Sequence, residues 1–157
     1  MNILSWNIEK LVDAMRISKA EVLQYFRDGR RVSFIIERRI ANEVLFGHVA
    51  ESEGAAFDVL DEHGNKWEIR SISKGGIYFC PSYMVGSGRH FEKAGFLAKL
   101  DEIEGYVVAD ITAFPDVPCW KIPSDVVRAW WNENKLGTTT KITRDTAFRL
   151  INSLRNA

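Results

Sequence analysis

The stretch that decides the fold is Ala56-Phe-Asp-Val-Leu-Asp-Glu-His-Gly-Asn-Lys-Trp-Glu-Ile-Arg-Ser-Ile-Ser73, near the middle of the chain. It holds two runs typical of β-strands, residues 56–60 and 66–73, which are rich in β-branched and aromatic side chains. The residues between them include Gly64 and Asn65, which favour a turn. We therefore predict a β-hairpin at this place.

Three charged side chains of this hairpin are expected to meet. Side chains alternate between faces along a strand, so Glu68 and Arg70 share one face, and the turn brings Asp58 back beside them. Two converging carboxylates repel each other and raise each other's pKa unless a counter-ion lies between them. Hard oxygen ligands with room for water suit magnesium, which is widely used in phosphodiester hydrolysis. The alternative is an ordinary edge pair whose charges only face solvent.

The residues before the hairpin are spaced as in helices. Apolar residues at three- and four-residue steps predict two short helices within the first 28 residues, the second opened by the capping-box pair Ser18 and Glu21. A long helix is expected from about residue 32 to residue 49. Its acids Glu37 and Glu43 are candidates for a further metal ligand, although a helical glutamate among arginines is usually an exposed ion-pair partner.

The residues after the hairpin alternate between strands and helices. We expect a strand at 77–80, a glycine-rich loop at 85–89 and a helix at 91–103. Two strands are expected next, at 105–113 and 117–122, and then two helices that begin at Ser124 and Thr143. The strand at 105–113 is apolar on both faces, which is typical of a central strand covered by helices. The predicted class is therefore α/β, with a central mixed β-sheet flanked by helices.

The hairpin also carries a recognisable pattern, an Asp followed after a turn by Glu-x-Arg. This run, Asp58 to Ile72, resembles the hairpin motif of the PD-(D/E)XK nuclease superfamily, in which the last residue is Lys. The order of elements from about residue 30 to residue 125 is also similar to that of type II restriction endonucleases. The resemblance implies a restriction-endonuclease-like core and a Mg²⁺-dependent endonuclease of a restriction system that hydrolyses phosphodiester bonds of double-stranded DNA.

The resemblance also implies a role for each matching residue. Asp58 and Glu68 would ligate Mg²⁺, Ile69 would lend its backbone carbonyl, and the residue at position 70 would orient the attacking water or stabilise the phosphate. Position 70 departs from the family, because the guanidinium of Arg70 is essentially never deprotonated and cannot act as a general base. Three explanations stay open: Arg70 supplies charge only, Lys66 or Lys74 substitutes, or the site has lost catalysis.

Basic side chains outside the hairpin are candidates for DNA contacts. The 21 basic and 21 acidic residues cancel, so no global positive charge marks the chain as a nucleic-acid binder. Arg30 and Arg31, near a start that is similar to a helix-turn-helix, are candidates for contacts with the DNA backbone. Arg89 and His90 are candidates for phosphate or a guanine edge, and Lys74 for a further DNA contact. The alternatives are a solvated helical face and a mobile loop.

Length and composition suggest one domain over residues 1–157, with N-terminal helices (1–30), a catalytic core (31–125) and C-terminal helices (126–157). We find no signal peptide, lipidation motif or run of 18 apolar residues, so a cytoplasmic protein without a membrane partner is expected. Cys80 and Cys119 are predicted to be buried free thiols.

A homodimer is expected, because one small domain holds one cutting centre and palindromic sites match two-fold symmetry. One alternative function is a catalytically impaired, nuclease-fold module that binds DNA or another partner. A second alternative is a protein-interaction domain, favoured by the neutral net charge and by the tryptophans of the C-terminal third.

Overall fold

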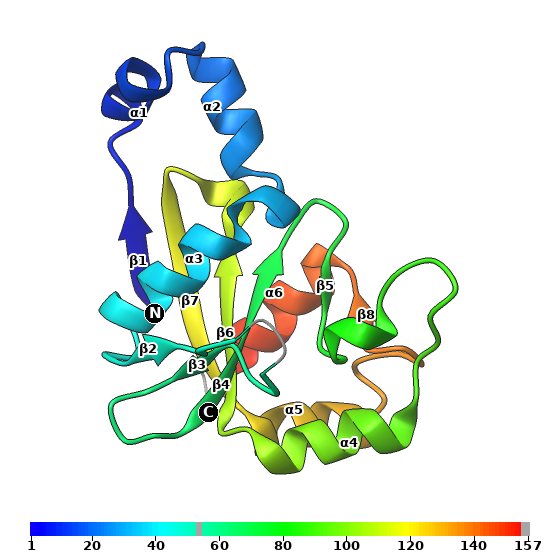
Figure 1. Ribbon diagram of the computed structural model, residues 1–157. Helices are drawn as coiled ribbons and strands as arrows, with labels where there is room; N and C mark the ends of the chain where they lie inside the picture. Colours follow the sequence, from blue (N-terminus) through cyan, green and yellow to red (C-terminus); the bar gives the residue numbers. More distant parts are fainter. Residues whose placement is uncertain (53–54, 155–157) are drawn as a thin grey trace.

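A computed structural model of the chain describes residues 1–52 and 55–154, with the backbone alone described for Arg30. Six strands form one mixed sheet in the order β1-β7-β6-β4-β3-β2 (Figure 1). These strands are β1 (Asn2–Ser5), β2 (His48–Val49), β3 (Val59–Leu60), β4 (Lys66–Ile72), β6 (Gly105–Asp110) and β7 (Asp116–Pro123). A separate two-stranded sheet pairs β5 (Ile77–Tyr78) with β8 (Lys141–Ile142).

Six α-helices accompany the sheet within the described residues. They are α1 (Ile8–Met15), α2 (Lys19–Phe26), α3 (Gly29–Glu43), α4 (Lys93–Glu102), α5 (Ser124–Asn132) and α6 (Arg144–Ser153). Two single turns of 3-10 helix, η1 (Ser82–Met84) and η2 (Ile111–Ala113), connect other elements. The parallel pair is β4 with β6, and the chain between these two strands includes α4.

The central strand β6 separates two hydrophobic cores. Val107 and Ala109 point into the first core, whereas Tyr106 and Val108 point into the second, as the two-residue period of a strand requires. All residues of β6 are buried, which confirms the prediction of a central strand covered on both faces.

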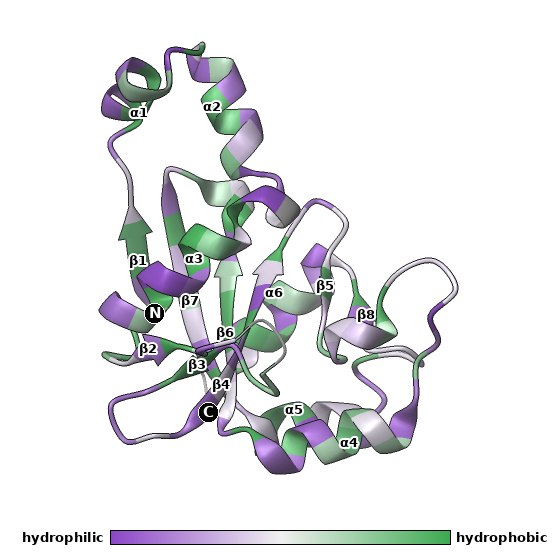
Figure 2. Cartoon of the chain, viewed as in Figure 1, coloured by the Kyte–Doolittle hydropathy of each residue, from purple (hydrophilic) through white to green (hydrophobic). Residues whose placement is uncertain are grey.

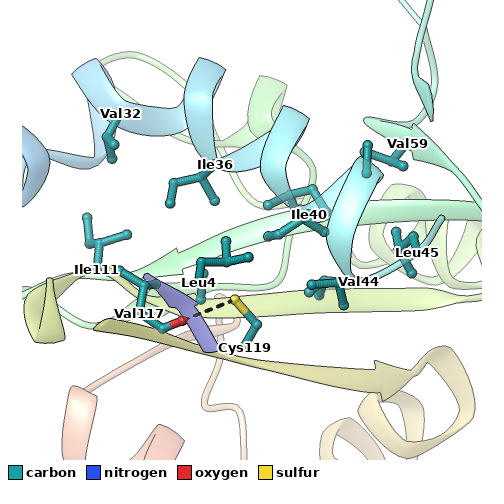
Figure 3. Close-up of a cluster of buried hydrophobic side chains, with 14 of the residues drawn as sticks. Leu4, Val32, Ile36, Ile40, Val44, Leu45, Val59, Ile111, Val117 and Cys119 are labelled. Carbon is teal, nitrogen blue, oxygen red and sulfur yellow. Dashed lines mark hydrogen bonds between the residues drawn. The ribbon is translucent and has the colours of Figure 1, made fainter. Parts of the chain in front are cut away.

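Helix α3 covers the first face of the sheet. Figure 3 shows a row of side chains facing the strands: Val32, Ile36 and Ile40 of α3, and Val44 directly after it. These positions recur every four residues, so they form one stripe along the helix and bury it against Leu4, Val117 and Cys119. The second core is built from residues of β6, α4, α5 and α6. The coarse class, an α/β protein with a mixed sheet and flanking helices, is therefore confirmed.

The prediction of one long helix from residue 32 to residue 49 is wrong. Helix α3 ends at Glu43, and β2 follows at His48, paired with β3. Phe46 has a left-handed backbone with φ of 53°. A Cβ at Gly47 would lie 1.9 Å from the carbonyl oxygen of Leu60, so the glycine permits the close approach of the chain to the hairpin.

Other differences concern strands. The strand β1 was not expected, because its four residues show only a short apolar pattern; it pairs with β7 at the edge of the sheet. The strand predicted at 77–80 is short, and β5 pairs with β8 rather than joining the main sheet. The predicted hairpin forms, with Val59 opposite Trp67, but β3 covers only Val59 and Leu60 of the strand predicted at 56–60.

Two smaller predictions can be compared with the structure. Cys80 and Cys119 are buried free thiols, as expected. Among the described residues, none of the helices is both long enough and apolar enough to cross a membrane.

Candidate functional site

The hairpin brings two carboxylates together, as the sequence predicts. Glu68 lies on β4 and is 5% exposed, and Asp58 lies one residue before β3. The backbone N–H of Ile69 donates a hydrogen bond of 2.7 Å to Asp58 Oδ2, which fixes this carboxylate against the strand that carries Glu68. Burial raises the pKa of Asp58, and the negative charge of Glu68 raises it further.

The guanidinium of Arg70 lies among these acids. Its Nη2 is 2.7 Å from Glu68 Oε2, and its Nη1 is 3.6 Å from Asp58 Oδ2. Nη1 also donates a 2.8 Å hydrogen bond to the carbonyl of Ile69, and Nη2 donates one of 3.3 Å to the carbonyl of Cys80. Burial alone would lower the pKa of Arg70, but the charges of Glu68 and Asp58 outweigh it and raise that pKa. Arg70 is therefore a permanent cation.

A second cation reaches the site from α4. Lys99 Nζ is 2.9 Å from Glu68 Oε1, on the carboxylate oxygen that Arg70 does not contact, and it also donates to the carbonyl of Ala56. Its side chain is only 12% exposed. The sequence interpretation missed Lys99, because it lies 31 residues after Glu68. The available signal was the apolar pair Phe96 and Leu100, which fixes the face of α4 that turns toward the sheet.

Glu37 on α3 borders the site on its other side. Burial raises its pKa to about 7, and the charge of Asp58 adds to that rise. Glu37 and Asp58 line one shallow cleft, together with Phe34 and Phe57. Of the two glutamates predicted as helix ligands, Glu37 is therefore the one that lies near the hairpin acids.

The structure places Glu43 away from the hairpin acids. Glu43 forms an ion pair with Arg39 and lines a different cavity beside Cys119. Asp61 lies in the hairpin turn between β3 and β4. There it accepts hydrogen bonds from the side chain of Trp67 and from Asn65; these bonds outweigh desolvation and lower the pKa of Asp61 to about 2.

A cleft of about 380 Å³ opens over the acids. Asp58, Glu68 and Lys99 line it, and the segment 81–83 and Gly95 form its wall. The donors that could hold a metal here are the carboxylates of Asp58 and Glu68, together with the carbonyl oxygen of Ile69 next to them in the chain. Within residues 1–52 and 55–154, no group of three or more His, Cys, Asp and Glu side chains is placed to hold one.

The predicted DNA-binding residues do not gather at one place. Arg89 is exposed, and its Nη1 donates bonds of 3.1 Å to the carbonyls of Ser82 and Val85, so it lies next to the cleft wall. His90 is exposed beside it. Lys74 is exposed beyond the end of β4, roughly 20 Å along the chain from Glu68.

Two further candidates lie at the start of α3. Arg31 is exposed and forms a 3.4 Å ion pair with Asp28. The side chain of Arg30 lies outside the described part of the structure. Lys66 and Lys74, which the sequence suggested as substitutes for a catalytic lysine, are both exposed, whereas Lys99 contacts Glu68 directly.

Comparison with known proteins gives no match: no family model, no curated protein and no solved structure matches the chain. The resemblance to the PD-(D/E)XK nucleases therefore stands on the hairpin motif and the order of elements alone.

Proposed function

We propose that the chain is a Mg²⁺-dependent endonuclease that hydrolyses phosphodiester bonds of double-stranded DNA, with a restriction-endonuclease-like core. The observation that carries the proposal is the convergence of Asp58 and Glu68 in one cleft, with a lysine and an arginine at the same acids. The Ile69 carbonyl accepts a hydrogen bond from this arginine, Arg70. Carboxylates for a metal and cations for a phosphate are the two requirements of this chemistry.

The arrangement of elements supports the same proposal. Helix α3 precedes the hairpin, the acids lie on the hairpin, and β7 with Trp120 follows, in the order that the resemblance implies. The acids also stand at a gap between β4, α4 and the 81–83 segment, where a phosphate of an extended substrate has access.

The donor set fits magnesium in its chemistry. The three oxygens are hard ligands, and magnesium is held by one or two protein carboxylates while several waters complete its shell. Burial and the charge of Glu68 raise the pKa of Asp58, although Arg70 and Lys99 lower it, and a bound cation would favour its ionised form. The guanidinium of Arg70 contacts the same oxygens, so a bound cation requires this side chain to rotate away.

The chain's own residues then have distinct tasks. When bound, the metal supplies Lewis-acid activation of the phosphate and lowers the pKa of a water molecule. Lys99 holds Glu68 by one oxygen and offers an ammonium to a phosphate oxygen or to the attacking water. Arg70, once displaced from the acids, offers two parallel donors to the phosphate. Glu37, whose pKa is about 7, is suited to exchange a proton near neutral pH.

A second candidate is a nuclease-fold module that binds DNA without cutting it. The observation that favours it is the guanidinium of Arg70, which contacts all three proposed metal donors and balances their charge without a metal. In this case the acids and Arg70 form a buried ion-pair network with a structural role.

The experiment is incubation of supercoiled plasmid and genomic DNA with the purified chain, in Mg²⁺ or in EDTA. Cutting in Mg²⁺ that is lost in Asp58→Ala and kept in Asp145→Asn, an exposed acid on α6, supports the endonuclease. Absence of cutting by the wild type and by Arg70→Lys, together with retained binding of duplex DNA in a gel-shift assay, supports the binding module instead. Absence of both cutting and binding would overturn both proposals.

A further inference from the structure

A second surface with a separate chemistry lies on the hairpin of α1 and α2. Figure 1 shows these two helices projecting from one end of the sheet, away from the rest of the molecule. The turn between them has three residues, Arg16 to Ser18, and Arg16 adopts the left-handed conformation that ends α1. A three-residue turn between two helices matches the helix-turn-helix arrangement in turn length.

The second helix of this hairpin has a firmly defined start. The Ser18 side chain accepts from the Glu21 N–H at 3.2 Å, and the Glu21 carboxylate accepts from the Ser18 N–H at 2.8 Å. This capping box fixes the first turn of α2 and uses the Glu21 carboxylate within the protein. Hydrogen bonds from Ser18 lower the pKa of Glu21, so its carboxylate stays ionised and is held at the N-terminus of α2.

The hairpin is fixed to the body through the inner face of α2. Val22 and Phe26 are buried, and the ring of Phe26 stacks on that of Phe114 with centroids 4.5 Å apart. Arg27 Nη2 donates to the carbonyl of Phe114 at 3.2 Å. Trp6 adds a second ring contact with Phe114. The orientation of α2 on the sheet is thus determined, and its outer face is left to solvent.

The outer face of α2 carries groups that read bases. Ala20 and Gln24 are exposed and four residues apart, so they stand one above the other on the helix. A glutamine amide pairs with the N6 and N7 edge of adenine, and a small apolar side chain contacts the methyl group of thymine. Figure 2 shows hydrophilic and hydrophobic residues side by side on these helices. This stripe therefore presents an amide and a methyl group, which are the chemical groups that contact adenine and thymine edges.

Exposed cations lie on the segments before and after α2. Arg16 is exposed in the turn, and Arg31, at the start of α3, is exposed and forms a 3.4 Å ion pair with Asp28. Lys19 pairs with Glu9 at 3.0 Å, but both side chains are more than half exposed, and such a pair adds little stability, so Lys19 can turn to a phosphate. Phosphates flank a major groove, and basic residues near a reading helix are complementary to them.

We propose that α1 and α2 form a DNA-binding helix-turn-helix, with α2 in the major groove of double-stranded DNA and Gln24 reading sequence. This surface is distinct from the cleft of Asp58 and Glu68. This proposal requires no divalent cation, and it does not depend on the proposed nuclease activity.

The test is selection of duplexes with a random 20-base-pair segment by the full chain in EDTA, followed by fluorescence anisotropy. We expect an enriched sequence that binds at least about tenfold tighter than a scrambled duplex. Gln24→Ala should reduce that ratio by at least about fivefold. Asn132→Ala, an exposed amide on α5, is the matched control and should leave the ratio unchanged.

A second variant separates groove entry from base reading. Ala20→Glu places a carboxylate against the phosphates and should abolish duplex binding at unchanged helicity by circular dichroism. Three results would overturn the proposal: no enriched sequence, a preference that Gln24→Ala leaves intact, or binding to single-stranded RNA or protein in place of duplex DNA. Because cation is absent throughout, a chain that fails to cut DNA can still pass this test.

Discussion

Replacement of Glu37 by Gln should stabilise the protein at alkaline pH and leave its stability unchanged at acidic pH. Burial and the charge of Asp58 raise the pKa of Glu37 from 4.5 to about 7. Below pH 4.5 the carboxyl group is protonated in both the folded and the unfolded chain, so it costs nothing. Between pH 4.5 and 7 the unfolded chain ionises first, and folding then requires proton uptake. The destabilisation is complete above pH 7, and Gln removes it.

The size of the effect follows from the shift in pKa. A shift of about 2.5 units corresponds to an upper limit of roughly 3.4 kcal/mol at 1.36 kcal/mol per unit. Glu37 is only partly buried, so solvent screening reduces this to on the order of 1.5 kcal/mol. For a domain of this size, that gain raises Tm by about 3 to 6 °C at pH 8.

The assay is urea denaturation of the wild type and of Glu37→Gln at pH 5 and pH 8, in EDTA. Glu43→Gln is the matched control, since Glu43 lies on the same helix but pairs with Arg39 away from Asp58. We expect the gain at pH 8 in the Glu37 variant alone. An equal gain in stability at both pH values, or a gain of the same size in the control, would refute the reasoning that ionisation of Glu37 beside Asp58 destabilises the folded protein.

Three further predictions concern neighbouring residues. Lys99→Met should lower the free energy of unfolding by about 3 kcal/mol, because it leaves one oxygen of the buried Glu68 unpaired; urea denaturation measures this, and a loss below about 1 kcal/mol would contradict it. Arg70→Met should increase the rise in Tm that Ca²⁺ produces, because it removes the competing cation; an equal rise in wild type and variant would show that Arg70 and the metal do not compete. Gly47→Ala should cost about 3 kcal/mol through its backbone clash, against about 1 kcal/mol for the left-handed but open Gly64→Ala, and similar losses in both would exclude the clash.

The hairpin and its acids could be predicted from sequence because every determinant is local. Strand alternation places Glu68 and Arg70 on one face, and the turn residues return Asp58 to them within about ten residues. The end of α3 could not be predicted in this way. The four-residue spacing of Ile36, Ile40 and Val44 continues to His48, and only the contact of Gly47 with the hairpin shows that the chain has already left the helix. Tertiary packing decides that boundary.

Lys99 was missed for a related reason. It belongs to α4, and nothing near it in sequence marks it as a partner of Glu68. Its position depends on the docking of α4 through Phe96 and Leu100, and Gly95 allows the helix to approach Tyr83 closely. Lys99 directly precedes Leu100, which faces the core, so a search for lysines next to the apolar residues of this helix would have included Lys99.

The position of Lys99 changes the meaning of Arg70. In the nuclease family that the hairpin resembles, one lysine at position 70 is expected to serve the substrate, whereas here two cations divide the two oxygens of Glu68 between them. A guanidinium reaches Glu68, Asp58 and the Ile69 carbonyl together, which a single ammonium on a lysine at position 70 does not match in geometry. Under the proposed function, Arg70 would balance the acids before a metal binds, and Lys99 would remain at Glu68 afterwards. An arginine at position 70 is compatible with that function, because Lys99 brings an ammonium to Glu68 from α4.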